Sequence, residues 1–308
     1  MENKRLYKVI SVLTNLLKGK KEAIQLTLIA FFSEGHLLIE DLPGLGKTTL
    51  ALSIAKVLNL DFGRIQCTSD LLPTDITGVK IYDKKTGEFI FYKGAIFNNI
   101  VLVDEINRTT PKTQSALLEA MEEKQITIEG ETYQLPNPFF VIATQNPVEY
   151  YGTFPLPEAQ LDRFSLKINI GYPSREEEKE ILLGGNKRDE IENLKPILNR
   201  EDIFKIKEEI KKVYISDKII DYILDIANYT RSNEMFLSGL SVRGTLTISK
   251  LAKTRAYFEG RDFVIPEDIK YLAPYSIPHR VLLKDKYEEI NKEEVIKSIL
   301  EEIKVPIV

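Results

Sequence analysis

The feature that most constrains the fold is a short apolar stretch that runs directly into a glycine-rich loop and then into a helical pattern. Residues 36–40 (HLLIE) have the composition of a buried strand, residues 41–47 (DLPGLGK) form the loop, and residues 48–58 (TTLALSIAKVL) follow with helical periodicity. Glycines in such a loop let backbone N–H groups surround a phosphate, and the helix N-terminus adds its partial positive charge. The order strand, loop and helix therefore predicts a phosphate-binding loop at the edge of a parallel sheet.

The polar residues of this loop have expected partners on a bound nucleotide. Lys47 would reach the β- and γ-phosphates, and the Thr48 hydroxyl would bind Mg²⁺. ATP with Mg²⁺ is therefore the expected ligand. The predicted nucleotide-binding residues are Pro43, Gly44, Leu45, Gly46, Lys47, Thr48 and Thr49.

Asp41 occupies the position of the first glycine in the pattern G-x-x-x-x-G-K-T. Aspartate tolerates left-handed backbone angles better than most residues, so we expect the shape of the loop to survive. A carboxylate near the phosphates is mildly unfavourable unless it points outward. We therefore expect an Asp41→Gly variant to bind ATP at least as tightly as the wild type.

Four further apolar stretches alternate with helical patterns in the first part of the chain. Short apolar runs of this kind are typical of strands that are buried on both faces of a parallel sheet. The pattern predicts an α/β domain over residues 1–172, built on a five-stranded parallel sheet. The four additional strands are expected at residues 62–66, 100–105, 139–145 and 166–170.

The composition changes after Pro173, where helical periodicity takes over. Ser174 and Glu177 form a capping-box sequence at the start of this region. We therefore predict a second, all-helical domain over residues 173–308.

Two stretches in the first domain, residues 78–94 and 126–135, alternate in polarity around turns that contain glycine. This pattern predicts two β-hairpins that interrupt the α/β order. They are either surface decoration or loops that face the pore of a ring or a partner.

Three polar residues at strand ends complete a candidate hydrolytic site. Asp104 and Glu105 end the apolar stretch IVLVDE, where Asp104 would hold Mg²⁺ and Glu105 would orient the attacking water. Asn146 follows the stretch 139–145 and is placed to bond the γ-phosphate or that water. An asparagine in this position alone is more often only a turn residue.

Two arginines are candidates for stabilising charge in the transition state. Arg163 ends the segment LPEAQLDRF, and a guanidinium there could act on the nucleotide of a neighbouring subunit. Arg243, in LSVRG, falls in the first turn of an expected helix, where a cation opposes the helix dipole. This unfavourable placement indicates a purpose such as contact with a phosphate.

Over about residues 6–275 these segments resemble the MoxR family of AAA+ ATPases. The stretches that carry the resemblance are GHLLIEDLPGLGKT, RIQCTSDLLPTDITG, the run from GAIFNN through VLVDEINR to ITIEGETY, FFVIATQNPVEYYGTFPLPEAQLDRF and LSVRG. The resemblance implies an AAA+ P-loop core followed by a helical lid. It further implies that Lys47 and Thr48 are Walker A, Asp104 and Glu105 Walker B, Asn146 sensor 1, Arg163 the arginine finger and Arg243 sensor 2.

The same resemblance implies how such a chain works. It implies a hexameric ring in which the hairpin at 78–94 is an insertion in the second helix. MoxR-like ATPases resemble chaperones that mature or remodel partner proteins, often ones with von Willebrand factor A domains. An ATPase with this role is the expected function.

Composition narrows the alternatives without removing them. A net charge of -4 and a pI near 5.6 argue against general nucleic-acid affinity. A motor on nucleic acid, a metal-chelatase-type subunit and a scaffold with negligible hydrolysis stay open as alternatives. Cys67 is the only cysteine and is expected to be buried, and the N-terminus has no apolar signal segment, so a cytoplasmic protein is predicted. His36 could touch an adenine, although a structural role is favoured.

Overall fold

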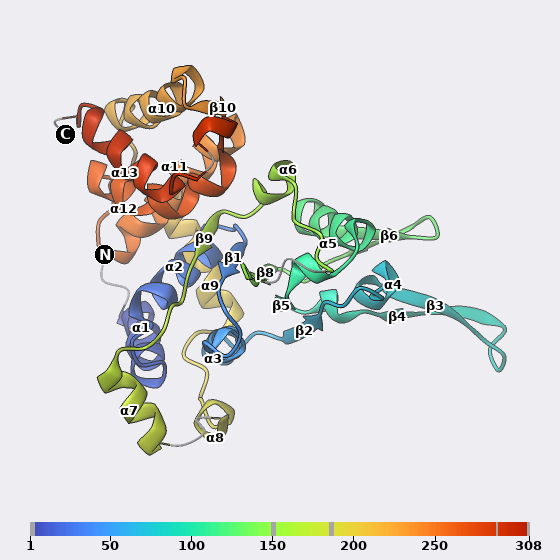
Figure 1. The fold of residues 1–308 in the computed structure, drawn as a ribbon. Helices are drawn as coiled ribbons and strands as arrows, with labels where there is room; N and C mark the ends of the chain where they lie inside the picture. Colours follow the sequence, from blue (N-terminus) through green and yellow to red (C-terminus); the bar gives the residue numbers. More distant parts are fainter. Residues whose placement is uncertain (1–3, 149–151, 185–187, 288, 307–308) are drawn as a thin grey trace.

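A five-stranded parallel sheet forms the centre of the computed structural model, which describes residues 4–148, 152–184, 188–287 and 289–306. The strand order is β2-β5-β8-β1-β9, and every neighbouring pair is parallel (Figure 1). The predicted five-stranded sheet is therefore confirmed. The strands are β1 (Leu37–Glu40), β2 (Phe62–Gln66), β5 (Ile100–Asp104), β8 (Phe140–Gln145) and β9 (Leu166–Ile168).

Both faces of this sheet are covered, which explains why its central strands β5, β8 and β1 are largely apolar. In β5, Ile100 and Leu102 belong to one hydrophobic cluster, whereas Val101 and Val103 belong to another on the opposite face. The first cluster packs under α1 (Lys4–Leu16), α2 (Lys21–Phe32), α3 (Lys47–Val57) and α9 (Arg200–Lys211). The second packs under α4 (Pro73–Thr77) and α5 (Pro111–Glu123).

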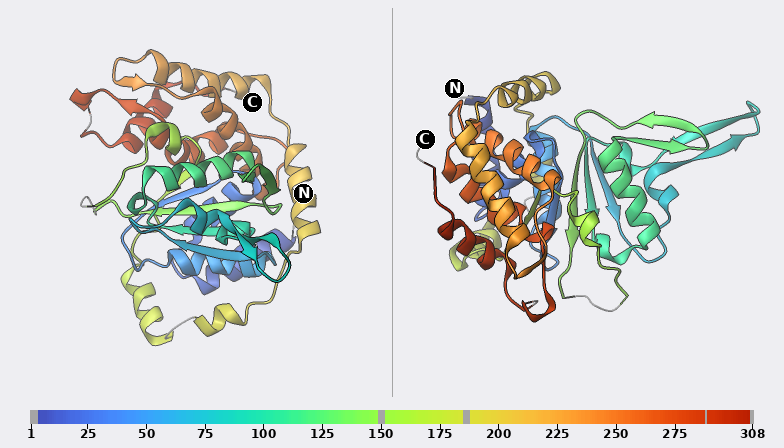
Figure 2. Two further views of the ribbon diagram at one scale, coloured as in Figure 1. Left: turned by 90° about the vertical axis from the view of Figure 1, so that its right-hand side faces the viewer. Right: turned by 90° about the horizontal axis from the view of Figure 1, so that it is seen from above.

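Two β-hairpins project from the body on the side away from the C-terminal helices (Figure 2). One consists of β3 (Gly78–Asp83) and β4 (Glu88–Lys93), and the other of β6 (Gln125–Ile128) and β7 (Glu131–Gln134), so both predicted hairpins are confirmed. Phe91 and Tyr133 join them through rings whose centroids lie 4.2 Å apart. The two hairpins therefore support each other at their bases.

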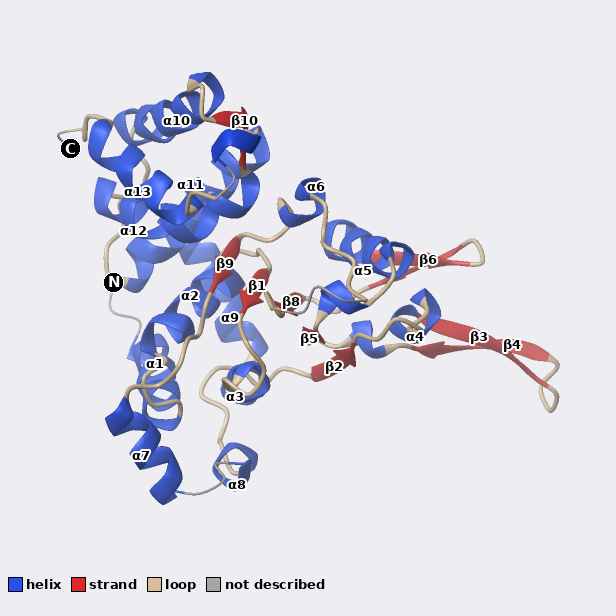
Figure 3. Cartoon of the chain, in the orientation of Figure 1, coloured by secondary structure: helices blue, strands red, loops and turns tan. Residues whose placement is uncertain are grey.

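The C-terminal part is a helical lid that contacts both α2 and β9. It is predominantly helical (Figure 3). It also contains a short antiparallel pair, β10 (Phe236–Ser238) with β11 (Leu282–Leu283). Among the helices in the described ranges, none is long and apolar enough to span a bilayer. The lid helices are α10 (Asp217–Ser232), α11 (Val242–Phe258), α12 (Pro266–Ser276) and α13 (Lys292–Glu302).

Three helices lie between the last core strand and the lid. The capping box predicted at the start of α7 is present, because the amide of Ser174 donates to Glu177 and the amide of Glu177 donates back to Ser174 Oγ. Of the next two helices, α8 packs on α3 of the core, whereas α9 packs on both α2 of the core and α11 of the lid. The domain boundary at residue 173 therefore stays a prediction. The connecting helices are α7 (Arg175–Gly184), α8 (Arg188–Glu192) and α9, whose bounds are given above. Elsewhere in the described ranges, 3₁₀ turns lie at 95–97, 106–108, 278–280 and 285–287.

Candidate functional site

The loop after β1 has the open, donor-rich shape that a phosphate group needs. Gly44 and Gly46 have φ angles of 86° and 91°, which glycine adopts without strain. A Cβ added at either glycine would meet no heavy atom within 4 Å, so the space in front of the loop is open. Gly46 is the N-cap of α3 and provides no side-chain cap, which leaves the first amides of the helix available to a ligand.

Lys47 lies at the start of α3 and faces back across the loop. Its Nζ donates to the carbonyl oxygens of Asp41 at 2.6 Å and Leu42 at 3.1 Å. Burial lowers the pKa of Lys47, while the nearby carboxylates of Asp41, Asp104 and Glu105 raise it. Lys47 therefore lies close enough to Asp104, the last residue of β5, and to Glu105 after it, for their charges to act on it.

Both oxygens of Asp104 have partners on adjacent strands. Arg64 of β2 donates to Oδ2 from Nη2 at 2.6 Å and from Nε at 3.1 Å, and Thr144 Oγ1 of β8 donates to Oδ1 at 3.1 Å. A metal ion that binds Asp104 directly must therefore share or displace the Arg64 contact. The sequence did not predict the contact of Arg64 with Asp104. That contact depends on β2 lying beside β5, and the motif around Asp104 does not specify the order of the strands.

Glu105 has an unusual backbone for a residue that is not glycine. Its φ is 57° and its ψ is 53°, in the left-handed region, and its amide donates to Thr144 Oγ1 at 2.8 Å. Its carboxylate accepts from Arg108 Nη1 at 2.9 Å. Strained backbone conformations that are held by surrounding contacts are common at active sites, where a side chain needs a fixed orientation. Thr144 therefore fixes both acidic residues at once.

The donor set suits Mg²⁺ bound together with a nucleotide. No group of three or more His, Cys, Asp and Glu that could hold a metal unaided occurs within the described residues. Mg²⁺ in nucleotide sites needs only one or two protein oxygens, because phosphates and water supply the others. Thr48 in the first turn of α3 and Asp104 at the end of β5 provide such oxygens.

Asn146 directly follows β8, beside β5, and is therefore at the same edge of the sheet as Asp104. It is mostly buried, and its Oδ1 accepts from the amide of Val148 at 3.2 Å. This bond is the one that a turn asparagine makes. It nevertheless lies at the same end of the sheet as Asp104.

Asp41 has a different structural role from the one expected. It is not among the described residues with a positive φ, so the loop does not need the left-handed angles that aspartate was expected to tolerate here. Its carboxylate instead accepts from the amides of Ile170 and Gly171, just beyond β9. Lys20 donates to the carbonyl of Gly171 at 2.6 Å and strengthens the same junction. Asp41 therefore ties the start of the phosphate loop to the chain that leaves the sheet.

Asp41→Gly should lower the free energy of unfolding by about 2 kcal/mol, because two backbone amides lose a charged acceptor. ATP affinity should not weaken, because the carboxylate points toward these amides and not toward the loop. Urea denaturation and nucleotide titration measure the two effects. Asp41→Asn keeps an acceptor oxygen and should lose less stability. A glycine variant as stable as the wild type, or one that binds ATP much more weakly, would show that this account of Asp41 is wrong.

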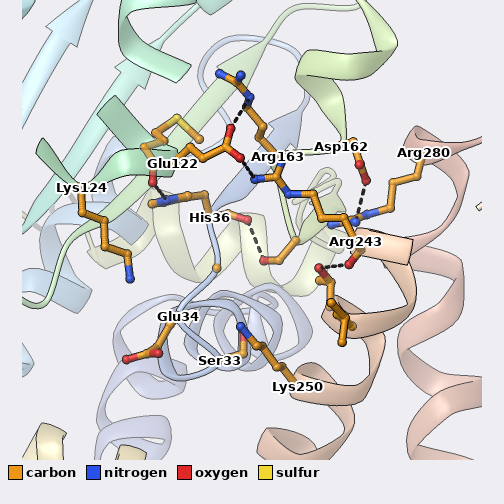
Figure 4. Close-up of a pocket in the computed structure, with 15 residues that line it drawn as sticks. Ser33, Glu34, His36, Glu122, Lys124, Asp162, Arg163, Arg243, Lys250 and Arg280 are labelled. Carbon is orange, nitrogen blue, oxygen red and sulfur yellow. Dashed lines mark hydrogen bonds and ion pairs between the residues drawn. The ribbon is translucent and has the colours of Figure 1, made fainter. Parts of the chain in front are cut away.

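Arg163 and Arg243 lie together, but at the opposite edge of the sheet from Lys47. Arg163 precedes β9, which runs parallel to β1 with Leu166 opposite Leu37, whereas the phosphate loop follows β1. A strand of four residues spans about 13 Å. Arg163 and Arg243 both form ion pairs with Glu122 of α5, at 3.2 and 2.6 Å (Figure 4).

His36 lies at the same end of the sheet as these arginines, where the parallel strands begin (the amino edge). It has a structural role. Its Nδ1 accepts from the amide of Val141 at 3.0 Å, so Nε2 carries the proton and donates to the carbonyl of Met121 at 3.2 Å. Burial lowers the pKa of His36 to about 4. Both ring nitrogens are therefore bonded within the protein, which is the structural role that was favoured for His36. Cys67 is fully buried, as predicted, and burial raises the pKa of its thiol to about 12.

Comparison with known proteins points to one family. The sequence model of the "ATPase family associated with various cellular activities (AAA)" matches residues 36–166, and that of the "AAA lid domain" matches residues 228–303. The uncharacterized protein YeaC of Bacillus subtilis is 48% identical over 97% of this chain and 94% of its own. Chaperone MoxR1 of Mycobacterium tuberculosis is 38% identical over 98% of this chain and 82% of its own. The crystal structure of a candidate ATPase from Cytophaga hutchinsonii superposes with a TM-score of 0.90 and 40% identity, over 98% of this chain and 95% of that one.

Proposed function

Because this chain belongs to the MoxR family of AAA+ ATPases, we propose that it hydrolyses ATP at the boundary between subunits of a ring. One observation carries the proposal. Lys47 and Asp104 lie at the carboxyl edge of the sheet, whereas Arg163 and Arg243 lie at its amino edge. In a ring, the phosphate loop of a subunit would face one neighbour and its two arginines would face the other. Each subunit would then supply the phosphate loop of one site and the arginines of the next.

The residues of the loop edge would bind and orient the substrate. Lys47 would exchange its bonds to the carbonyls of Asp41 and Leu42 for the β- and γ-phosphates. Thr48 and Asp104 would hold Mg²⁺, which when bound offsets the negative charge of the phosphate oxygens. Glu105, aimed by Thr144 and Arg108, would orient and polarise the attacking water, and Asn146 would contact the γ-phosphate or that water.

The residues of the opposite edge would act on the nucleotide of the next subunit. Arg163 would place its guanidinium against the charge that develops on the transferred phosphoryl group. Arg243 shares a carboxylate partner with Arg163, so we propose that it also acts in trans. Hydrolysis would then require assembly, whereas nucleotide binding would not.

We further propose that hydrolysis drives the remodelling of a partner protein. The hairpin of β3 and β4 exposes large apolar and aromatic side chains along its length, among them Ile81, Phe89 and Tyr92, which are between 50% and 64% exposed. Contact with an unfolded or rearranging protein would suit such a surface. A hexameric ring and a partner with a von Willebrand factor A domain, as the family resemblance implies, are the specific form of this proposal.

The specific rate of phosphate release should rise with protein concentration, because each active site needs an arginine from a neighbour. ATP binding per subunit, measured by titration with a non-hydrolysable analogue, should change little over the same range. Mass photometry at each concentration reports assembly, and Lys47→Ala serves as the inactive control. A constant specific rate down to concentrations at which only single subunits are present would contradict the proposal.

A further inference from the structure

Glu122, near the C-terminal end of α5, contacts both arginines of the amino edge. Its Oε2 lies 3.2 Å from Arg163 Nε, and its Oε1 accepts from Arg243 Nη2 at 2.6 Å. One carboxylate therefore joins a residue of the core to a residue of the lid. Glu122 comes from neither the segment of Arg163 nor the helix of Arg243 (Figure 4).

Glu122 does not contact the two terminal nitrogens of the Arg163 guanidinium. Glu122 meets Arg163 at Nε, the nitrogen nearest the backbone side of the guanidinium, and the two terminal nitrogens point away from the carboxylate (Figure 4). These terminal nitrogens form the fork that binds phosphate oxygens in pairs. Glu122 thus lies behind the guanidinium of Arg163, whereas on Arg243 it engages one terminal nitrogen, Nη2.

A second carboxylate joins the same two segments independently. Asp162, next to Arg163, accepts from Ser241 Oγ at 3.0 Å and from Arg280 Nη1 at 2.8 Å. Ser241 is the N-cap of α11 and accepts from the amide of Gly244, so it fixes the first turn that carries Arg243. The segment 162–163 and the start of α11 are therefore cross-linked by both Asp162 and Glu122.

We infer that Glu122 is a positioning residue that holds Arg163 and Arg243 as one preassembled pair for the phosphates of the next subunit. This inference rests on the proposed function. Two guanidinium groups placed together repel each other, and a single carboxylate between them offsets one of the two charges. The pair keeps a net positive charge, which leaves it able to bind the phosphates.

Stability alone gives little reason for this arrangement. The side chains of Glu122, Arg163 and Arg243 are 36%, 27% and 43% exposed. Ion pairs with this much solvent contact typically contribute little to stability. Substitution of Glu122 should therefore leave the fold intact and affect mainly the aim of the arginines.

Glu122→Gln should lower kcat by on the order of 100-fold, as displacements of about 1 Å in a catalytic group do in enzymes. The dissociation constant for ATP and the size of the ring should stay at their wild-type values, because the phosphate loop lies at the other edge of the sheet. Glu123→Gln is the matched control, since it makes the same change on the next residue of α5, which is exposed. This control should keep wild-type turnover.

The decisive measurement repeats Glu122→Gln in an Arg163→Ala background, with single-turnover assays of radiolabelled ATP to resolve slow rates. If Glu122 acts through Arg163, most of its effect disappears there, because residues that act as a unit are not additive. An undiminished drop in that background, or wild-type turnover of Glu122→Gln alone, would overturn the inference. Wild-type turnover of Arg163→Ala would instead refute the proposed site in trans, so the two failures are distinguishable.

Discussion

Arg163→Ala should lower the turnover of ATP by at least about 10³-fold, the lower end of the effect of arginine fingers in phosphoryl transfer. The affinity for ATP should stay near that of the wild type. The reason is geometric, because Arg163 precedes β9 at the amino edge of the sheet, whereas the loop that binds phosphate follows β1 at the carboxyl edge. Steady-state phosphate release and analogue titration measure the two quantities on the same preparation.

A matched control separates this effect from a general loss of surface charge. Arg5→Ala removes an exposed arginine of α1 that pairs with Asp202, and this variant should keep wild-type turnover. Arg163→Lys keeps the charge but loses the planar fork, so it should recover little activity. Near-normal turnover by Arg163→Ala, in rings of wild-type size, would remove the role assigned to this residue.

Glu105→Gln should abolish most turnover while leaving ATP bound, so that rings persist in the presence of ATP. General acid–base groups contribute about 10²–10⁴-fold to rates, and glutamine cannot polarise water as a carboxylate does. The substitution keeps the side-chain length, and an amide oxygen can still accept from Arg108. Single-turnover hydrolysis gives the rate, and mass photometry in ATP reports the persistence of the ring.

The same variant offers a way to capture the partner protein. A ring that binds ATP but does not hydrolyse it should retain a remodelling substrate, whereas Lys47→Ala should not. Proteins recovered with Glu105→Gln and absent from the Lys47→Ala sample are therefore candidate partners. Full hydrolysis by Glu105→Gln would show that Glu105 does not orient the water.

The sheet and its hairpins could be predicted because their signals are local. Apolar runs such as 100–105 and alternating stretches such as 78–94 carry their own periodicity, and the phosphate loop has a fixed spacing between glycines and Lys47. The contact of Arg64 with Asp104 depends on which strands are neighbours, and no single motif contains that information. Local patterns therefore predicted the elements but not the pairs that they form.

The arginines proposed to act on the neighbouring nucleotide were predicted individually, but the contacts that hold them together were not. Arg163 and Arg243 were candidates in the sequence, yet their joint partner, Glu122, lies in a helix whose polar residues resemble an ordinary solvated face. For Asp41, the sequence showed that it replaces a glycine. It did not show its partners, the amides of Ile170 and Gly171, which lie just after the end of β9. Both contacts arise only once the chain has folded.

Mixed rings test most directly whether each active site is completed by the next subunit. Subunits with Lys47→Ala keep Arg163 but cannot bind a nucleotide productively. Subunits with Arg163→Ala keep the phosphate loop but lack the arginine. Each variant alone should be nearly inactive. An equal mixture should regain activity, because roughly a quarter of the boundaries in a closed ring of random composition then combine both intact halves. A mixture of confirmed mixed rings that stays as inactive as its components would contradict the account.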